Sequence, residues 1–118
     1  QNTAFYGARK DVEDFYLNSD YVVCPSVSGE GSSGVIKEGM AAGKIVITSD
    51  LIANKELIDD GINGIMFKTG DSSALTAALN KAINKDIVIE SQNIKDKVSL
   101  FDCSNTINQY IALYKKTL

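Results

Sequence analysis

The sequence has 118 residues, 44% hydrophobic and 23% charged, a composition typical of one globular domain with a sizeable core. Its formal net charge of −3 argues against a nucleic acid or an anionic membrane as a partner. It contains no histidine, which excludes Ser–His and Cys–His nucleophile pairs and most zinc sites, and no apolar run of the roughly 18 residues that would span a bilayer.

The first predicted strand is the apolar run "TAFYG" at 3–7. The segment 11–19 that follows has the pattern of a short helix with Asp11 as its N-cap. The apolar stripe of this helix is predicted to consist of Val12, Phe15 and Tyr16.

The second predicted strand is "YVVCP" at 21–25, and a glycine- and serine-rich turn leads from it into a helix at 34–42. One side of this helix carries Val35, Ile36, Gly39 and Met40. Because Cys24 lies in the apolar strand, we expect it to be a buried free thiol rather than half of a disulfide with Cys103.

The third and fourth predicted strands are "IVIT" at 45–48 and "GIMF" at 64–67. Between them we expect a short helix at 54–59 and a turn at Asp60-Gly61. A longer helix at 71–84 has the clearest stripe, formed by Leu75, Ala78, Leu79, Ala82 and Ile83. No strand is predicted after residue 85, and Ser104 is expected to cap a last helix that carries Ile107, Tyr110, Ile111 and Tyr114.

Strands that alternate with helices and are apolar on both faces indicate an α/β fold, a parallel sheet of about four strands with helices on both faces. Such sheets bind ligands outside the carboxyl ends of their strands. Three loops lie there in this chain, at 7–10, 25–34 and 48–54, and the loop 25–34 is the richest of them in glycine.

The stretch "GEGSSGVIKEGMAAGK" at 29–44 therefore carries the candidate site. The free amides and the dipole of a helix N-terminus favour a phosphate, and Gly31 and Gly34 allow its close approach. Ser32 and Ser33 either cap the helix or bind a phosphate oxygen. Glu30 can accept hydrogen bonds from sugar hydroxyls, and Glu38 can hold a ribose, although each is also explained as an ordinary solvated carboxylate.

From residue 5 to about 84 the chain resembles the retaining glycosyltransferases of family 4, the "group 1" enzymes of GT-B fold. The matching features are, in order, "FYGARKDVEDFYLNSDYVVCPS", "EGSSGVIKEGMAAGKIVITSD" and "NKELIDDGINGIMFKTGD". They follow the family pattern of a strand ending in Gly, an "SD" before a strand ending in "PS", the E-x7-E helix and "DG-x-x-G".

The resemblance implies that Glu30, assigned a catalytic role, contacts the donor sugar and that Glu38 holds the nucleotide ribose. It further implies donor contacts from two groups of residues, Gly31, Ser32, Ser33, Gly34 and Val35 in the turn, and Gly7, Ala8 and Arg9 after the first strand. Glu56 is interpreted as structural. No metal and no cofactor are implied, since the nucleotide-diphosphate sugar is a substrate.

Several positions depart from the family pattern. Ser32 and Ser33 replace the usual Phe-Gly after the first glutamate, which leaves the recognised sugar open. Gly39 replaces the usual Ala at a cost of about 0.5–1 kcal/mol in helix propensity. Ile52-Ala53 stand where the family has a Gly-Gly pair.

The resemblance also implies that residues 1–118 are one domain, a fragment of the donor-binding domain of a longer enzyme. The acceptor, a sugar or glycolipid, would bind a missing N-terminal domain, so the fragment alone is expected to be inactive. Two family strands that separate 3–7 from 21–25 are missing as well, and we expect these two runs to pair directly or to exchange between chains in a dimer. Surface polysaccharide or glycolipid synthesis in the cytoplasm, peripheral to the inner face of the membrane, is the implied setting.

Two other functions stay open at this point. One is a non-catalytic module that binds nucleotide sugars, because fold alone does not establish activity. The other is a different GT-B enzyme, such as a sugar-nucleotide epimerase or a phosphorylase, against which the lack of histidine argues weakly.

Overall fold

The core of the protein is a parallel sheet of three strands, seen in a computed structural model that describes residues 2–117. The strands β1 (Tyr21–Cys24), β2 (Ile45–Ser49) and β3 (Gly64–Phe67) lie in that order, so that β2 is the central strand. The predicted α/β class with a parallel sheet is confirmed.

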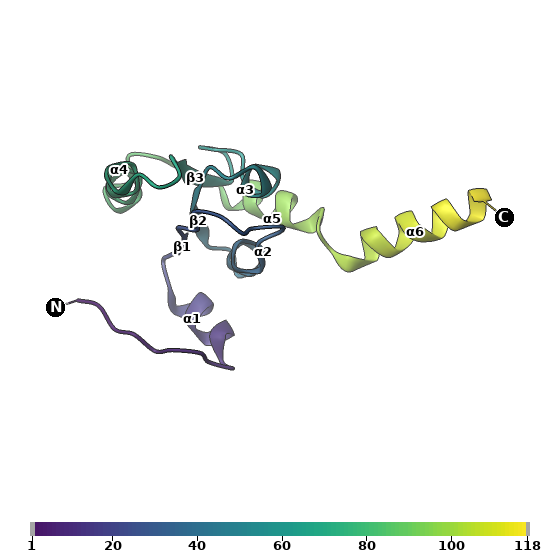
Figure 1. The fold of residues 1–118 in the computed structure, drawn as a ribbon, viewed down its shortest axis with the longest axis horizontal. Coiled ribbons are helices and arrows are strands. Elements are labelled where there is room, and N and C mark those ends of the chain that lie inside the picture. Colours follow the sequence, from purple (N-terminus) through teal and green to yellow (C-terminus); the bar gives the residue numbers. More distant parts are fainter. Residues whose placement is uncertain (1, 118) are drawn as a thin grey trace.

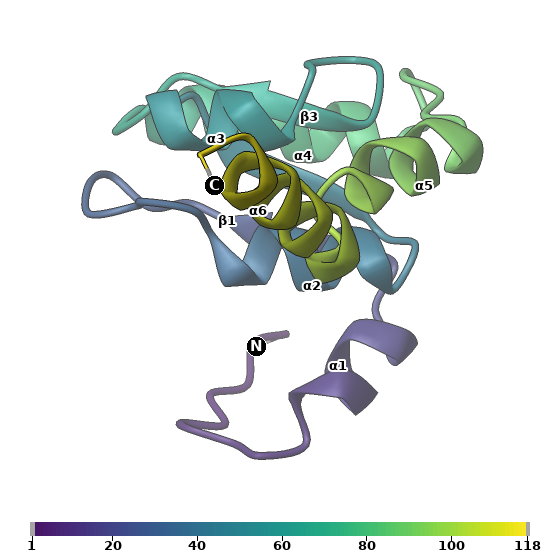
Figure 2. The ribbon, with the colours of Figure 1, turned by 90° about the vertical axis from the view of Figure 1, so that its right-hand side faces the viewer.

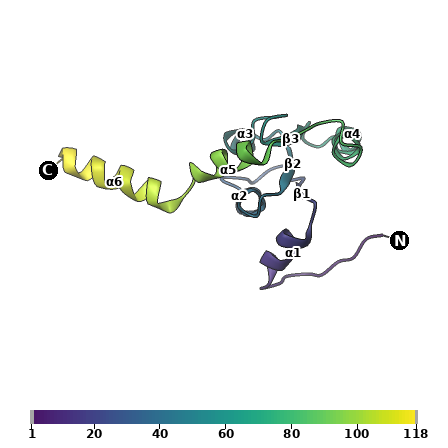
Figure 3. The same cartoon turned by 180° about the vertical axis from the view of Figure 1, so that it is seen from behind.

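Different helices cover the two faces of the sheet, because neighbouring residues of a strand point to opposite sides. Val46 belongs to a buried cluster with α2 (Gly34–Ala41), α3 (Ile52–Leu57) and α5 (Ser91–Ser99). Ile47 belongs to a second cluster, formed with β3 and α4 (Ser72–Ile83). Figures 1 and 3 show α4 on one side of the sheet and the other three helices on the opposite side.

The predicted strand at 3–7 is wrong, and the sheet of the described residues has three strands rather than about four. This segment runs outside the sheet (Figure 2), and 92% of Phe5 is exposed. A local aromatic cluster holds it against α1 (Val12–Asn18) instead, because the Tyr6 ring packs edge-on against Phe15 and Arg9 lies over both rings. Direct pairing with β1 therefore does not occur.

The helices agree with the sequence where an apolar stripe is long, and differ where it is short. The helix predicted at 71–84 is α4, with Ala78 and Ala82 buried, although Ile83 is exposed. The helix predicted at 54–59 is α3, which begins two residues earlier. Helix α5 is absent from the sequence prediction, because Ile94 and Val98 are the only apolar residues among its nine and give too short a periodic pattern.

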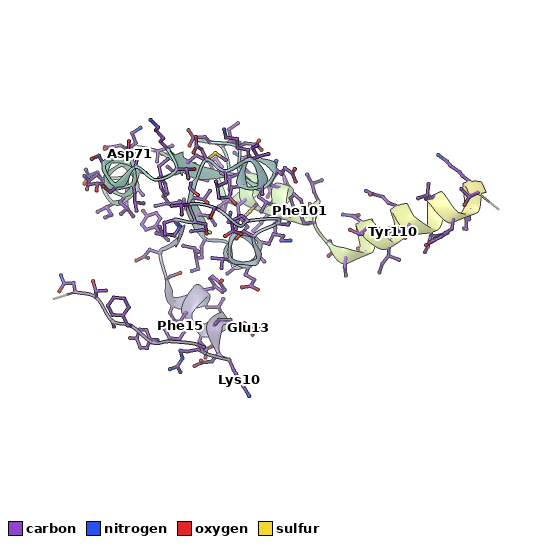
Figure 4. All side chains as sticks on the ribbon, viewed as in Figure 1. Lys10, Glu13, Phe15, Asp71, Phe101 and Tyr110 are labelled. Carbon is purple, nitrogen blue, oxygen red and sulfur yellow. The ribbon has the colours of Figure 1, made fainter. Side chains whose placement is uncertain are left out.

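Aspartates begin the outer helices in different ways. The Asp71 carboxylate accepts from the N–H of Ala74 at 2.9 Å and so caps α4 (labelled in Figure 4). Asp11 is the N-cap residue of α1, as predicted, but its carboxylate binds Arg9 and makes no cap hydrogen bond. At the start of α6 (Cys103–Thr117) the Asp102 carboxylate accepts from the N–H of Ser104 at 2.8 Å, so the acid and not the predicted serine acts as the cap.

Helix α6 extends away from the sheet, and the molecule measures 60 × 30 × 28 Å as a result. The predicted apolar stripe of this helix is exposed, and Tyr110 stands clear of the rest of the chain (Figure 4). Over residues 2–117, no helix combines the length and the apolar character needed to cross a membrane.

Two glycines allow close packing around the central strand. A β-carbon added at Gly39 of α2 would lie 3.1 Å from Cγ2 of Val22 and 3.2 Å from Cγ2 of Val46. A β-carbon added at Gly64 of β3 would lie 2.8 Å from the backbone oxygen of Val46 and 2.9 Å from Cγ2 of Ile58. The departure from the usual Ala at position 39 thus has a structural reason, since helix and sheet meet there.

We predict that Gly64→Ala destabilises the protein by about 1–3 kcal/mol, because a backbone oxygen cannot move aside as a side chain can. Urea unfolding monitored by circular dichroism measures this change. Gly31→Ala is the matched control, since a β-carbon at Gly31 meets nothing within 4 Å. Equal stability of the two variants would contradict the close packing at Gly64.

Candidate functional site

The candidate site lies where β1 ends and α2 begins, at the carboxyl edge of the sheet. The loop 25–33 connects the two elements, and Ser33 is the N-cap residue of α2. Ser33 makes no side-chain cap hydrogen bond, and its buried Oγ lies 3.7 Å from Sγ of Cys24 instead. Of the two roles considered for this residue, Ser33 thus occupies the cap position without capping through its hydroxyl, and the amides of the first turn are left to other partners.

Glu30 is half-buried in this loop, and side chains at the end of β1 and just after it contact its carboxylate. The hydroxyl of Ser26 donates to its Oε1 at 2.6 Å, and Sγ of Cys24 lies 3.9 Å from the same oxygen. A hydroxyl–carboxylate hydrogen bond of this length is among the stronger ones in proteins. Glu30 thus has a defined orientation at the mouth of the loop and is not a freely solvated carboxylate.

Glu38 lies one turn into α2 and folds back toward the start of the helix. A β-carbon added at Gly34 would lie 3.8 Å from its Oε1, so the carboxylate stands beside that glycine. Its other oxygen, Oε2, accepts from the hydroxyl of Tyr16 on α1 at 2.9 Å. The structure thus brings Glu38 and Gly34 together, as the sequence predicted, and adds a tyrosine that the sequence analysis assigned only to an apolar stripe.

The environment of Tyr16 raises the pKa of its hydroxyl. Burial, the hydrogen bond to Glu38 and the charges of Glu38 and Cys24 together raise the pKa of Tyr16 to about 12. Cys24 is buried and free, as predicted, and its Sγ lies 3.9 Å from Oε1 of Glu30.

The remaining residues of the turn are open to solvent. Gly31, Ser32 and Gly34 are exposed, and 42% of Val35 is exposed. The ammonium group of Lys37 donates to Oγ of Ser32 at 3.0 Å, which brings a positive charge back to the start of α2. A cation beside free helix amides suits an anionic group.

Gly7, Ala8 and Arg9 lie in the N-terminal segment before α1, outside the sheet (Figure 1). Arg9 donates to both carboxylate oxygens of Asp11, at 2.8 and 2.7 Å. This pairing lowers the pKa of Asp11 and raises that of Arg9. The structure does not join these three residues to the loop 25–33 through any hydrogen bond of the described residues, so their role as donor contacts stays a prediction.

Two grooves flank Glu38. One, of about 380 Å³, lies between α1 and α2 and is lined by Val12, Glu13, Tyr16, Leu17, Glu38, Ala41 and Ala42. The other, of about 390 Å³, lies between α2 and the end of α5 and is lined by Lys37, Glu38, Ala41, Val98, Ser99, Phe101 and Asp102. Glu38 is therefore accessible from both sides of its helix.

The sequence analysis missed a group of polar residues at the end of β2. Thr48, Ser49 and Asn54 are all fully buried and bond to one another and to the end of β1. Next to them Asp50 accepts from the N–H and the hydroxyl of Thr69, which lowers the pKa of Asp50. The available signal was the polar run "TSD" directly after an apolar strand, in a loop that the parallel-sheet rule had already singled out.

Within residues 2–117, no group of three or more His, Cys, Asp or Glu side chains is arranged so that it could hold a metal ion. Glu56 is exposed on α3.

Known proteins resemble this chain in sequence and in fold. The family model described as "Glycosyl transferases group 1" matches residues 1–85. A phosphatidyl-myo-inositol mannosyltransferase of Mycobacterium leprae is 32% identical over 100 residues, which are 83% of this chain and 27% of that protein. An N,N'-diacetylbacillosaminyl-diphospho-undecaprenol alpha-1,3-N-acetylgalactosaminyltransferase of Campylobacter jejuni is 24% identical over 97% of this chain and 31% of its own length.

Among solved structures, Anabaena HepE in complex with UDP matches with a TM-score of 0.71 and 27% identity, over 93% of this chain and 31% of HepE. Its complex with UDP-glucose matches with a TM-score of 0.70. The chain thus spans less than a third of the length of each of these relatives.

We predict that ionisation of Tyr16 makes the protein less stable at high pH. The folded-state pKa of about 12 lies above the ordinary value of 10.0, so the contribution of Tyr16 is fully present below pH 10 and is lost as the pH rises toward 12. Tyr16→Phe should remove this part of the decline, as measured by urea unfolding at several pH values and by ultraviolet titration of tyrosinate.

Tyr110→Phe on the exposed helix α6 is the matched control and should leave the decline in place. A Tyr16→Phe protein with the same stability profile as the parent between pH 10 and 12 would contradict the raised pKa of Tyr16.

Proposed function

The chain belongs to the group 1 glycosyltransferase family, and on that premise we propose that it is the donor-binding part of a retaining glycosyltransferase of GT-B fold. The parent enzyme transfers a sugar from a nucleoside diphosphate sugar to an acceptor. HepE, whose structures hold UDP and UDP-glucose, makes a uridine nucleotide the first donor to test.

One observation carries this proposal, the placement of both glutamates around the start of α2. Glu30 is fixed in the loop before the helix by Ser26, and the Glu38 carboxylate folds back beside Gly34. Two oriented carboxylates next to free helix amides match a ligand that has hydroxyls at both ends and phosphates between them.

In the proposed complex, each part of the turn meets one part of the donor. Glu30 accepts hydrogen bonds from the sugar and acts as the catalytic carboxylate of this chain. The amides of the turn at 31–35 and the helix dipole meet the diphosphate, with the Lys37 ammonium nearby. Glu38 holds the two ribose hydroxyls, and Gly7, Ala8 and Arg9 would approach the base.

The same groups explain how the chain promotes transfer. Negative charge builds on the leaving diphosphate as the bond to the sugar breaks. Amides that already point at that position stabilise the charge without reorganising. The nucleotide sugar is a substrate, and the proposal requires no resident cofactor or metal.

The proposal assigns the remaining functions to other parts of the parent protein. Relatives that are more than three times longer than the aligned region transfer sugars to lipid-linked acceptors, as their names state. By analogy, we place the acceptor, a sugar or glycolipid, on a further domain, and the parent enzyme in polysaccharide or glycolipid synthesis on the cytoplasmic face of a membrane. The 118-residue chain alone, as one fragment of the donor domain, should then show no transfer.

We predict that Glu38→Ala in the full-length enzyme raises the KM for the donor by about tenfold or more, because each lost hydrogen bond to a charged group costs about 1.5–3 kcal/mol. Donor-dependent release of UDP from UDP-glucose measures this, and GDP- and ADP-sugars are compared in the same assay. Glu90→Gln, at the start of α5, is the control.

An unchanged donor KM in Glu38→Ala would overturn the ribose assignment. Binding of a nucleotide sugar without any turnover by the full-length protein would favour the non-catalytic module instead.

A further inference from the structure

A buried polar network lies directly under the candidate site and is not explained by packing. Thr48, Ser49 and Asn54 are fully buried at the end of β2 and the start of α3, next to the apolar cluster that contains Val46 and Leu57. Buried polar groups cost free energy unless they are hydrogen-bonded, and apolar residues of similar size would fill the same space. These three residues therefore require a reason beyond core formation.

Asn54 is the centre of this network. Its Nδ2 donates to Oγ1 of Thr48 at 3.0 Å and to the backbone oxygen of Ser49 at 3.0 Å. Its Oδ1 is buried and has no hydrogen-bond partner among the described residues. An unpaired buried acceptor destabilises the folded state, so Asn54 is a poor choice for stability alone.

The network reaches the loop of the candidate site through two hydroxyls. Oγ1 of Thr48 donates to the backbone oxygen of Cys24 at 3.0 Å, and Oγ of Ser49 donates to the backbone oxygen of Ser26 at 2.6 Å. Both acceptors lie where β1 ends and the loop begins. The network thus fixes the position of the backbone at Ser26.

Ser26 in turn orients the carboxylate of Glu30, because its hydroxyl donates to Oε1 of Glu30 at 2.6 Å. Glycines stand on both sides of Glu30, and Gly29 has a φ of +81°. A carboxylate on such a permissive backbone has many orientations unless a side chain holds it. Among the hydrogen bonds of residues 2–117, none reaches Oε2 of Glu30, which leaves that oxygen for a ligand.

We propose that Ser26 is a positioning residue for Glu30, and that Asn54 and Ser49 hold Ser26 in place from beneath. This inference rests on the proposed function, in which Glu30 contacts the donor sugar. A carboxylate fixed before the donor arrives loses less entropy on binding and meets the transition state without reorganising.

The test is a double-mutant cycle in the full-length enzyme, with release of UDP from UDP-glucose as the measurement. Ser26→Ala should lower kcat by about tenfold to a hundredfold, the range expected for a hydrogen bond to a charged group. In a Glu30→Gln background the same Ser26→Ala change should alter kcat by less than about twofold, because the carboxylate that it orients is gone.

Three further variants separate positioning from stability. Ser26→Thr keeps the hydroxyl and should restore most of the activity. Ser28→Ala changes an exposed serine of the same loop and should match the parent enzyme. Ser49→Ala should lower kcat in the same direction as Ser26→Ala, with kcat expressed per folded protein as measured by thermal unfolding.

The outcomes distinguish the two proposals. If Glu30→Gln leaves kcat unchanged, the proposed sugar contact fails, and the positioning role fails with it. If Glu30→Gln lowers kcat but Ser26→Ala does not, or if the two effects simply add, the donor site stands and the positioning role is wrong. Normal kcat in Ser49→Ala would overturn the role of the network beneath Ser26.

Discussion

The close contact between α2 and the sheet at Gly39 is the constraint on which the site depends. With no side chain at this position, the helix lies directly over Val22 of β1 and Val46 of β2. Ile36 and Met40 are then fully buried on either side of the contact. The same placement sets the first turn of α2 at the end of β1, with Ser33 against Cys24. A methyl group at position 39 would push α2 away from the sheet, and this shift would move the amides of the first turn, Ser33 and Glu38 together.

At the carboxyl edge of the sheet, apolar core packing is followed directly by buried polar side chains. Apolar side chains fill both faces of the central strand up to Ile47, and polar ones take over at Thr48 and Ser49. The polar end is less favourable as a core but supplies directed hydrogen bonds, which apolar contacts do not. The strands thus end in a layer of hydrogen-bonded polar side chains, which can orient the loop that carries Glu30. The proposed catalytic group is held by the fold although it stands on a glycine-rich turn.

The outer elements contribute in unequal ways. Helix α1 has no buried residue, yet it delivers the hydroxyl of Tyr16 to Glu38. Helix α5 has one, Ile94, and an ion pair between Lys97 and Asp59 at 2.9 Å helps to hold it against the turn before β3. Helix α6 has no buried residue and stands apart from the sheet (Figure 1). The extent to which a helix is buried therefore does not decide whether it contacts the site. The single side chain of Tyr16, on the exposed helix α1, is enough to reach Glu38.

The sequence by itself determined the parallel α/β class, three strands, the helices α2 and α4, the free buried Cys24 and the order of the two glutamates. These features depend on local periodicity, on turn residues and on a motif whose spacing is fixed along the chain. Only the tertiary structure decided that residues 3–7 form no strand, because a strand exists through its partner, and here Tyr6 and Arg9 pack against Phe15 instead. It likewise decided that Tyr16 meets Glu38 and that Asn54 and Ser49 lie beneath Ser26. The contacts of Tyr16 with Glu38 and of Ser49 with Ser26 join residues 22 and 23 positions apart, a separation that no local pattern records and that only folding closes.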